Sequence, residues 1–263
     1  MQIISSKDND LIKHIKKLKD RKHRDESNQY VIEGMKLITE AIKEKVKIDK
    51  IIICENCEIS ENMSKEMMYE IAKYDCIYVT DQVFKSITGV NTPQGILAII
   101  NKMQEKQEID YSQDIIVALD NIQDPGNMGT ILRTVDSAGL NQILISKGSV
   151  DCYNPKVVRS TMGAIFRVNI IECENLVNTL KEAKKHKFKI AVTSLQTEQS
   201  IYDIDYKNKV IVIGNEANGV SQQIQQITET KIKIPMLGRT ESLNASVATG
   251  IIIYEYIRKK YSP

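Results

Sequence analysis

The chain has 263 residues, of which 42% are hydrophobic, and this length and composition suit a folded protein of two ordinary domains rather than a disordered chain. Its 36 basic and 34 acidic residues leave a net charge of +2, so no overall field points to nucleic acid or to a membrane surface. No apolar run reaches the roughly 18 residues of a membrane span, and the amino terminus lacks a signal-peptide pattern, so we expect a cytoplasmic protein without membrane contact.

The first 24 residues are basic, with eight Lys or Arg against three acids. We expect one basic helix over 7–24, which is either a solvated helix face or an arm that contacts RNA phosphates. For a charge run taken alone, the solvated face is the favoured interpretation.

Strands and helices alternate in the first half of the chain, which predicts a small α/β domain. A short strand runs into an amphipathic helix over 30–45. Further strands are expected at 51–53, 76–80 and 95–100, and further helices at 64–74 and 81–89. Almost nothing apolar occurs in 104–113, so we expect domains at 1–106 and 114–263, joined by a linker over 107–113.

Five cysteines form an odd, scattered set, which favours reduced thiols over a disulfide framework. They are Cys54, Cys57, Cys76, Cys152 and Cys173. Cys54 and Cys57 have the spacing of a redox or metal motif, but no second such pair and no nearby pair of histidines accompanies them. Structural or incidental thiols are therefore favoured, and we expect no metal site.

The second half of the chain alternates again. Strands are expected at 115–119, 142–145, 168–171, 190–193, 210–213 and 231–234, and helices at about 128–138, 155–163, 174–186, 220–227 and 244–259. Nearly continuous aliphatic strands such as IIVAL and VIVI are what a parallel sheet covered on both faces requires. The predicted fold class is therefore α/β.

Three segments break this pattern, each just beyond the carboxyl end of an expected strand, where open α/β sheets bind their ligands. In the first, 119–140, a turn leads into a helix that Gly139 ends. Asn127 stands at the amino end of this helix, and Arg133 points away from its apolar stripe. Together they favour a phosphate or another anion, whereas an Arg taken alone more often forms a surface salt bridge.

The second segment, 211–221, contains Gly214, Glu216 and Gly219. The two glycines permit tight turns and the close approach of a ligand to backbone amides, with a carboxylate between them. The segment matches neither the Rossmann nor the P-loop pattern, so no nucleotide site of those kinds is indicated. An ordinary strand-to-helix turn is the alternative.

The third segment, 234–255, places Ser242, Asn244 and Ser246 at the start of a helix. A single capping residue contributes about 1 kcal/mol, and one cap does not explain three polar side chains. Three consecutive isoleucines at 251–253 indicate burial on more than one face, so this helix is either central or part of an obligate interface.

Together and in this order, the three segments resemble the motifs of the SpoU (TrmH-type) RNA ribose 2′-O-methyltransferases of the SPOUT superfamily. The matching patterns are Asn127-x-Gly129-x-x-x-Arg133, Gly214-x-Glu216-x-x-Gly219 and Ser242-Leu243-Asn244-x-Ser246. The resemblance covers 115–260, and YVIEGMKLITEAI with TPQGILAII also resembles the amino-terminal substrate-binding domain of many members. It implies a carboxyl-terminal α/β domain with a parallel sheet and a trefoil knot, preceded by a small RNA-binding α/β domain.

The resemblance also implies S-adenosylmethionine as the cofactor and a homodimer formed through the knot domain. Arg133 would be the catalytic residue that acts on the ribose hydroxyl. The residues that arrange the site would be Asn127, Glu216, Ser242 and Asn244. The residues that bind the methyl donor would be Thr193, Gly214, Ile234, Met236, Leu237 and Leu243. Because a guanidinium stays charged, we expect Arg133 to position the ribose together with an RNA phosphate rather than act as a free base.

The basic amino-terminal stretch and the small domain suit an RNA substrate. Members of the resembled family with this two-domain layout often modify ribosomal RNA of the large subunit, so the resemblance favours that substrate over transfer RNA. There are two rival interpretations, a non-catalytic RNA-binding ribosome factor on the same fold and an enzyme that methylates a base. The intact motifs argue against the first. Asn127, Arg133 and the Ser242-Leu243-Asn244 run argue against the second.

Overall fold

The computed structural model describes residues 3–56, 64–102 and 108–261. The chain forms two compact units. The amino-terminal unit comprises Met1–Glu105 and Asp151–Phe166, and the carboxyl-terminal unit comprises Lys106–Val150 and Arg167–Pro263. Residues 151–166 therefore belong to the amino-terminal unit, although in sequence they lie between two strands of the other unit's sheet.

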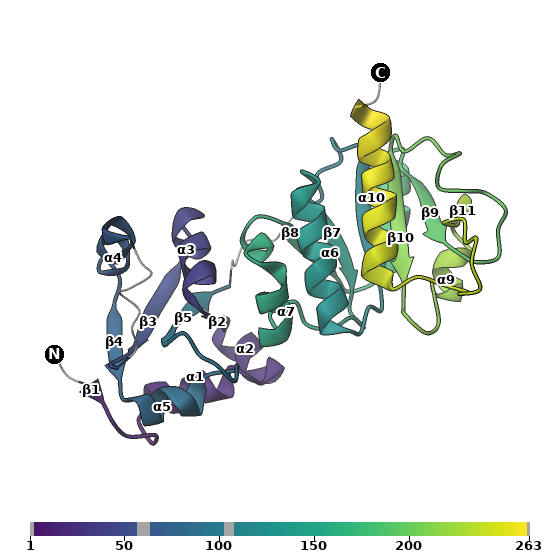
Figure 1. Cartoon of the computed structure of the whole chain (residues 1–263). Coiled ribbons are helices and arrows are strands. Elements are labelled where there is room, and N and C mark those ends of the chain that lie inside the picture. Colours follow the sequence, from purple (N-terminus) through teal and green to yellow (C-terminus); the bar gives the residue numbers. More distant parts are fainter. Residues whose placement is uncertain (1–2, 57–63, 103–107, 262–263) are drawn as a thin grey trace. The chain divides into compact units, whose positions relative to one another are not determined.

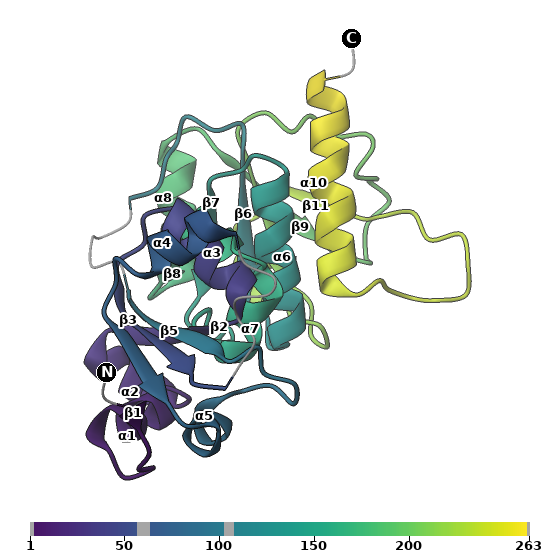
Figure 2. The same cartoon turned by 60° about the vertical axis from the view of Figure 1, so that its left-hand side comes forward.

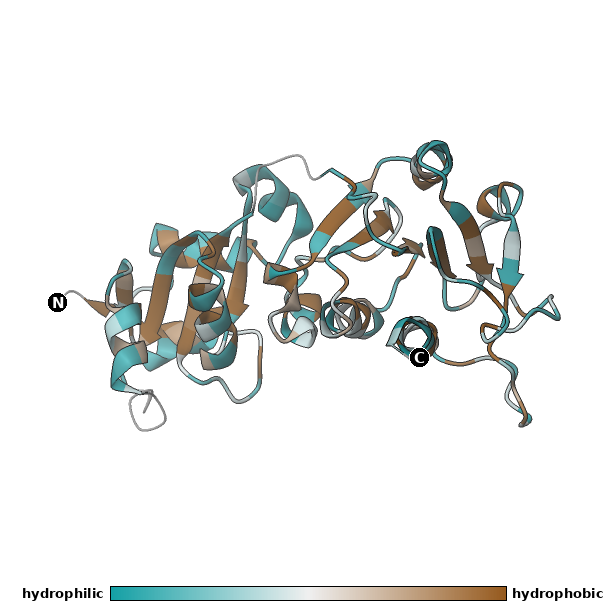
Figure 3. Ribbon diagram, turned by 90° about the horizontal axis from the view of Figure 1, so that it is seen from above, coloured by the Kyte–Doolittle hydropathy of each residue, from teal (hydrophilic) through white to brown (hydrophobic). Residues whose placement is uncertain are grey.

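A five-stranded mixed sheet with the order β1-β4-β3-β5-β2 forms the centre of the amino-terminal unit (Figure 1). Its strands are β1 (Ile3–Ile4), β2 (Gln29–Glu33), β3 (Ile48–Cys54), β4 (Cys76–Val79) and β5 (Ile96–Asn101). Strands β1 and β3 run parallel to β4, whereas β5 runs antiparallel to both β3 and β2. In Figure 3 the strands of this sheet are predominantly hydrophobic, as burial between layers requires.

Helices cover both faces of this sheet. The helices of the unit are α1 (Asp10–Lys17), α2 (Arg21–Ser27), α3 (Met35–Lys43), α4 (Lys65–Ile71), α5 (Asp81–Ile87) and α7 (Pro155–Thr161). On one face, Ile15 of α1 and Phe84 of α5 join Ile52 and Leu97 of the strands in one buried core. Helix α3 lies on the other face and buries Leu37 (Figure 1).

The prediction of one basic helix over 7–24 is wrong, because the segment forms two helices, α1 and α2. The break follows from Asp20, whose carboxylate accepts a hydrogen bond from the backbone N–H of Lys22 at 2.9 Å and so caps α2. Charge alone did not reveal this local stop.

Arg24, one of the basic residues of that segment, is only 2% exposed. Its Nε donates to Oδ2 of Asp151 at 3.0 Å, its Nη2 donates to the same oxygen, and its Nη1 donates to the carbonyl oxygen of Leu18 at 2.8 Å. Arg24 therefore attaches the start of the 151–166 segment to α2 and is not available to contact RNA.

The carboxyl-terminal unit contains a six-stranded sheet with the order β11-β9-β10-β6-β7-β8, in which every neighbouring pair is parallel. Its strands are β6 (Ile115–Asp120), β7 (Gln142–Ser146), β8 (Asn169–Cys173), β9 (Lys189–Thr193), β10 (Lys209–Gly214) and β11 (Thr230–Ile232). The predicted parallel sheet is thus confirmed, and each strand lies within about two residues of its expected bounds.

Two pairs of helices cover this sheet, α8 and α9 on one face and α6 and α10 on the other (Figure 3). Their bounds are α6 (Pro125–Ser137), α8 (Leu176–Lys185), α9 (Gln222–Gln225) and α10 (Ala245–Tyr261). Helices α6 and α10 lie side by side (Figures 1 and 2), and the hydroxyl groups of Ser137 and Tyr254 lie 3.2 Å apart. This pairing brings the first and third motif segments together.

The expected linker lies partly outside the described residues, since residue 107 is not among them. Residues 108–113 form neither helix nor strand. The side chain of Gln142 binds the backbone of Asp110 through hydrogen bonds of 2.9 and 2.6 Å, and Tyr111 stacks on His186 with ring centroids 3.8 Å apart. These contacts attach the stretch to the carboxyl-terminal unit.

Four of the five cysteines are described, and all four are free thiols. Cys57, the second cysteine of the motif-like spacing, lies outside the described residues. Within the described ranges, no cluster of His, Cys, Asp or Glu could hold a metal ion. Nor does this part of the chain contain a helix with the length and apolar character that crossing a membrane requires.

Candidate functional site

The site forms at the carboxyl edge of the parallel sheet, where β6 and β10 end opposite one another. Asp120, the last residue of β6, pairs in register with Gly214, the last residue of β10. The chain leaves both strands at the same edge, so the first and second motif segments start side by side. This is the edge at which open parallel sheets bind ligands.

Asn127 is placed by the start of α6. The carboxylate of Asp124 accepts the backbone N–H of Asn127 at 2.8 Å, and Pro125 occupies the first turn, where its missing N–H costs nothing. Asn127 is buried, and its Nδ2 donates to Oε1 of Glu216 at 2.9 Å. The first motif segment is therefore joined to the second by a side-chain hydrogen bond.

Gly214 cannot carry a side chain here. A Cβ at this position would lie 2.1 Å from the backbone carbon of Gly219, because the loop after β10 folds back on the strand end. Two backbone hydrogen bonds between Asn215 and Gly219, at 3.0 and 2.9 Å, close that loop. Gly219 has φ of +67°, a conformation that favours glycine. Both glycines are thus required by the backbone path.

Glu216 projects from this loop and accepts hydrogen bonds from the first motif segment. Besides Asn127, the backbone N–H groups of Gln123 and Asp124 donate to its carboxylate at 3.2 and 3.3 Å. Partial burial alone would raise the pKa of Glu216, but the hydrogen bonds from Asn127 and from these backbone groups outweigh it, and the pKa lies below its ordinary value. Glu216 is therefore a carboxylate at neutral pH.

Asn244 caps α10. Its backbone carbonyl accepts the N–H of Ala248 at 2.9 Å, and its Oδ1 accepts the N–H of Ser246 at 2.9 Å and of Val247 at 3.3 Å. The hydroxyl of Ser246 donates to the same oxygen at 2.7 Å. Of the three polar residues at the start of this helix, Asn244 is the cap, Ser246 supports it, and Ser242 does neither.

A chain of hydrogen bonds, Glu216–Asn127–Asn244, connects the three motif segments. Asn244 uses its Nδ2 to donate to Oδ1 of Asn127 at 2.8 Å. The directions agree throughout, because the carboxylate can only accept, which turns the Nδ2 of Asn127 toward it and leaves the Oδ1 of Asn127 for Asn244. Each amide therefore has a single consistent orientation, and the three segments are held in one geometry.

A cavity of about 640 Å³ lies against this chain of hydrogen bonds. Its walls include eight of the eleven predicted catalytic and cofactor-binding residues, namely Thr193, Gly214, Glu216, Ile234, Met236, Ser242, Leu243 and Asn244. Three others are elsewhere. Asn127 lies behind Glu216 and Asn244, Leu237 is fully exposed, and Arg133 is exposed on α6, with neither of the last two on the cavity wall.

Arg133 is set apart from the cavity by the pitch of its helix. It follows Asn127 by six positions, which carries it about 9 Å along α6 and onto another side of the helix. None of the residues that the structure describes forms a hydrogen bond or an ion pair with its side chain. The guanidinium therefore lies on the α6 surface in the single chain.

Sequence reasoning missed Asn215, although it organises the loop after β10. Its Oδ1 accepts the backbone N–H groups of Ala217 and Asn218 at 3.0 Å each, and its Nδ2 donates to the carbonyl of Asn121 at 2.8 Å. An Asn just after a strand and four residues before a glycine is a turn signal that could have identified it. It holds the loop that carries Glu216.

Comparisons with known proteins agree with this arrangement. The family model of the SpoU rRNA Methylase family matches residues 114–254, and that of the MRM3-like substrate binding domain matches residues 9–98. The 23S rRNA (guanosine(2553)-2′-O)-methyltransferase RlmP of Bacillus subtilis (strain 168) is 30% identical over 255 residues, which are 97% of this chain and 98% of RlmP.

Solved structures cover the whole chain. The AdoMet-bound rRNA methyltransferase from Sinorhizobium meliloti superposes with a TM-score of 0.86 at 28% identity, covering 100% of this chain and 99% of that one. A putative RNA methyltransferase of the TrmH family from Porphyromonas gingivalis superposes with a TM-score of 0.82 at 28% identity, covering 95% and 98%. These neighbours confirm the expected fold class, a SPOUT α/β-knot domain with a parallel sheet, preceded in sequence by a small α/β domain. The chain belongs to the SpoU family of RNA methylases.

Proposed function

We propose that the chain transfers the methyl group of S-adenosylmethionine to a ribose 2′-hydroxyl of RNA, with 23S ribosomal RNA as its substrate. It is thus an RNA ribose 2′-O-methyltransferase that uses S-adenosylmethionine, as its family membership indicates. The carrying observation is the Glu216–Asn127–Asn244 chain of hydrogen bonds, which joins all three motif segments beside one cavity. The similarity to RlmP over nearly the whole length supports ribosomal RNA over transfer RNA.

The cavity fits S-adenosylmethionine in size and in chemistry. Its volume falls within the range of about 300–1,000 Å³ that is usual for sites of small organic cofactors. Gly214 and the loop after β10 form part of the cavity wall, Ile234 and Val220 supply apolar walls, and the carboxylates of Glu216 and Glu241 match a positively charged ligand. When bound, the cofactor supplies a methyl group on a positively charged sulfur, which is already activated toward in-line attack.

The chain's own residues have to align the ribose oxygen, because a ribose hydroxyl is almost fully protonated at pH 7. The reaction forms an oxygen–methyl bond, breaks the carbon–sulfur bond and releases the hydroxyl proton. Ser242 is exposed on the cavity wall, and none of the described residues hydrogen-bonds its hydroxyl, so it can bind the ribose. Asn127 hydrogen-bonds both Glu216 and Asn244, and this chain of bonds fixes the cavity wall next to Ser242.

Arg133 is proposed to orient the ribose together with a neighbouring RNA phosphate, since a guanidinium matches a phosphate with two parallel hydrogen bonds. Replacing it tests this role. Arg133→Ala should still bind S-adenosylmethionine in calorimetry but transfer methyl at least about a hundredfold more slowly. Normal turnover of this variant would exclude the role.

A homodimer through α6 and α10 is proposed because these helices share an exposed surface. On α10, Val247 is 49% and Tyr254 50% exposed, with Ile251 partly exposed between them. On α6, Arg133 and Ser137 are exposed beside this stripe. An isologous pairing through this surface covers the apolar stripe and brings Arg133 of each protomer to the interface, where it can reach its partner's cavity.

Mixed protomers test whether Arg133 acts across that interface. Arg133→Ala and Asn244→Ala protomers, each slow in methyl transfer alone, are mixed under conditions that exchange subunits. If Arg133 serves the partner's cavity, each mixed dimer has one intact site, and a 1:1 mixture should recover about a quarter of wild-type activity. If Arg133 serves its own cavity, the mixture should not exceed the residual activity of the two variants. Size-exclusion chromatography with light scattering measures the dimer itself.

The domain roles follow from the same proposal. Residues 1–106 form the substrate RNA-binding domain, 107–113 the linker and 114–263 the methyltransferase domain, acting in the cytoplasm where ribosomes are assembled. The match of residues 9–98 to a substrate binding domain supports the first assignment. The segment 151–166 adds to the amino-terminal unit in space while belonging to the methyltransferase domain in sequence.

A single incubation separates this function from its rivals. Purified protein with labelled S-adenosylmethionine is given 23S rRNA transcript or transfer RNA, and the product is hydrolysed in alkali. A methylated 2′-oxygen cannot attack the adjacent phosphate, so an alkali-resistant dinucleotide from the rRNA is expected. Label in an alkali-sensitive mononucleotide would indicate base methylation. Label only in transfer RNA would show that transfer RNA is the substrate. Binding of the cofactor without methyl transfer would indicate a non-catalytic factor.

A further inference from the structure

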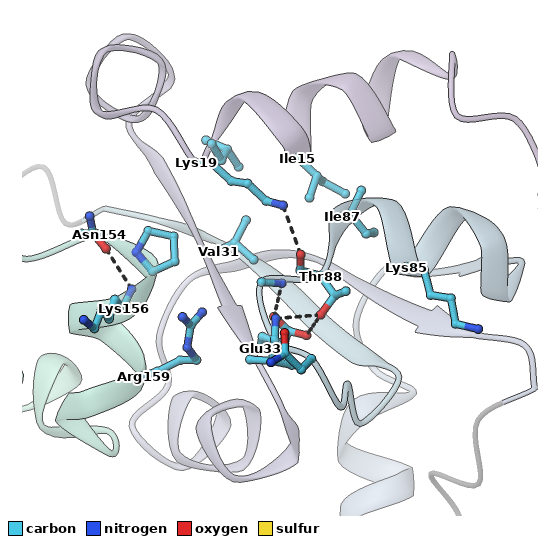
Figure 4. A pocket seen from close by; sticks show the side chains of 15 residues that line it. Ile15, Lys19, Val31, Glu33, Lys85, Ile87, Thr88, Asn154, Lys156 and Arg159 are labelled. Atoms are coloured by element: carbon cyan, nitrogen blue, oxygen red, sulfur yellow. Dashed lines mark hydrogen bonds between the residues drawn. The ribbon is translucent and has the colours of Figure 1, made fainter. Parts of the chain in front are cut away.

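A second cavity, of about 560 Å³, lies within the amino-terminal unit (Figure 4). Residues from α1, β2, the end of α5 and the 151–166 segment form its walls. Its inner wall is apolar and includes Ile15, Val31 and Ile87, whereas cationic side chains surround it. The cavity therefore combines an apolar surface with a positively charged rim.

The rim carries more positive than negative charge. Four cations, Lys19, Lys85, Lys156 and Arg159, line the cavity against one carboxylate, Glu33. In Figure 4, Lys19 and Arg159 extend toward the centre from different sides, and Lys85 extends away from it. Lys85 also pairs with Asp81 at 2.6 Å, outside the cavity wall.

Glu33 forms no ion pair with these cations in the part of the chain that the structure describes, and its two oxygens accept hydrogen bonds from the 88–89 turn. The hydroxyl of Thr88 donates to Oε1, and the backbone N–H of Gly89 donates to Oε2 at 2.9 Å. Lys19 Nζ donates to the carbonyl of Thr88 at 3.1 Å, which leaves its remaining hydrogens for a ligand. The negative charge of Glu33 therefore organises the 88–89 turn.

Arg159 is the central cation of this cavity. Its side chain is partly buried, and its Nη1 lies 3.0 Å from the position that a Cβ on Gly89 would occupy, so the glycine leaves room for the guanidinium. Within the described ranges, neither Arg159 nor Lys156 has a side-chain hydrogen bond or ion pair. A partly desolvated guanidinium without partners is ready to bind an anion that presents several oxygens.

We propose that this cavity binds the sugar–phosphate backbone of the RNA substrate, with Arg159 and Lys156 holding successive phosphates and Lys19 at the edge. The inference rests on the proposed function, which supplies an RNA to be held. Charge complementarity favours RNA, since guanidinium and ammonium groups are the usual partners of RNA phosphates, and such contacts fix register without reading sequence. Two amides on the wall, Asn91 and Asn154, are suited to ribose hydroxyls.

The proposal assigns RNA binding to residues outside the matched substrate-binding segment. That segment spans 9–98, whereas Lys156 and Arg159 come from α7, which follows β7 in the chain. The substrate-binding surface would then be completed by the part of the chain that carries the methyltransferase motifs. Removing only these two cations isolates that contribution.

The test compares two double substitutions of equal charge loss. Lys156→Gln with Arg159→Gln removes the cavity's unpaired cations. Lys36→Gln with Lys43→Gln removes two cations from α3, on the other face of the sheet. Filter binding of a labelled 23S rRNA transcript is measured over a series of salt concentrations, and S-adenosylmethionine binding by calorimetry reports the integrity of the carboxyl-terminal unit.

The cavity variant should bind the transcript roughly tenfold more weakly near 0.1 M salt. The slope of its plot of log Kd against log salt should be smaller by about 1.5, because each of the two lost phosphate contacts contributes about 0.7–0.9. The α3 variant should stay within about twofold of wild type. Cofactor binding should be unchanged in both. If the double cavity variant does not fold, Lys156→Gln alone, which changes an exposed side chain, should lose about 0.7 of slope.

An unchanged slope in the cavity variant would overturn the proposal, as would an equal loss in both variants. So would the absence of transcript binding by the wild-type protein. A different result would contradict the proposed function, namely a wild-type protein that binds the transcript with the expected slope but transfers no methyl group. In that case the cavity assignment stands as an RNA-binding site of a non-catalytic protein.

Discussion

Asn244 joins two features of the structure, the start of α10 and the hydrogen-bonded chain to Glu216, and two substitutions separate them. Asn244→Asp keeps an oxygen that accepts from the N–H groups of Ser246 and Val247, but it removes the Nδ2 that donates to Asn127. Asn244→Ala removes both. The first variant should lose activity with little loss of stability, and the second should lose both.

The expected magnitudes follow from the bonds that each substitution removes. Loss of a capping side chain costs about 1 kcal/mol, and loss of one partly buried hydrogen bond about 1 kcal/mol more, so Asn244→Ala should lower the free energy of unfolding by about 2 kcal/mol. Asn244→Asp retains the cap and adds a negative charge at the positive end of α10, worth about 0.3–1 kcal/mol, against the lost bond to Asn127. Its unfolding free energy should stay within about 1 kcal/mol of wild type.

Both variants should transfer methyl at least about tenfold more slowly, because Asn127 is no longer held against Glu216 from both sides. Urea unfolding measures stability, and initial rates with a 23S rRNA transcript measure transfer. Ser242→Ala is the stability control, since this exposed residue does not cap the helix, and its unfolding free energy should change by less than about 0.5 kcal/mol. Wild-type turnover by Asn244→Asp would show that the hydrogen-bonded chain is not needed, and wild-type stability of Asn244→Ala would refute the capping argument.

Three further substitutions test the geometry elsewhere. Gly214→Ala places a Cβ 2.1 Å from the backbone of Gly219, so it should displace the loop and abolish cofactor binding in calorimetry; binding at wild-type affinity would contradict the close approach. Glu216→Gln should lower the free energy of unfolding by about 1 kcal/mol near neutral pH. The folded-state pKa of Glu216 lies below the ordinary 4.5, so the stability difference between wild type and variant should be full above that value and disappear as the pH falls through the folded pKa. Chemical unfolding at several pH values measures this difference. Arg24→Met leaves Asp151 buried without its partner and should lower the unfolding free energy of the amino-terminal unit by about 3–5 kcal/mol, whereas a loss below about 1 kcal/mol would show that the pair is dispensable.

Much of the fold could be predicted because local pattern determines it. Uninterrupted aliphatic runs such as 115–119 and 210–213 can only be buried between two helical layers, and the structure places both at the centre of the parallel sheet. The same reasoning predicted that the ligand site lies at the carboxyl edge of the sheet, because parallel strands that end together bring the loops that follow them together. The position of Gly214 and Glu216 at that edge was therefore foreseeable.

The roles within the site were less accessible to sequence. Three polar residues near the start of α10 looked equivalent, and only the contacts separate the cap Asn244 from the free hydroxyl of Ser242. The link between Asn127 and Asn244 spans 117 residues, so no local spacing predicts it. Likewise, Arg133 is exposed on α6 without a side-chain partner among the described residues, and periodicity alone identifies only the side of the helix on which it stands.

The basic amino-terminal stretch shows the limit of arguing from charge. Eight cations in 24 residues looked like one surface, yet Arg24 is buried against Asp151, at a sequence separation of 127 residues. Conversely, Lys156 and Arg159 lie in a stretch without any notable excess of charge and still form part of a cationic cavity. Where a cation lies in space depends on the tertiary contacts of its segment, which composition does not encode.

The placement of residues 151–166 in the amino-terminal unit has a consequence for the order in which the chain folds during synthesis. Amino-terminal units ordinarily fold first, as soon as they leave the ribosome. Here that unit lacks α7 and the carboxylate that neutralises Arg24 until residue 166 has emerged, by which time β6 and β7 have been synthesised. Nascent chains from which residues 151–166 have not emerged should therefore remain protease-sensitive in their first hundred residues, and chains from which residue 166 has emerged should become resistant.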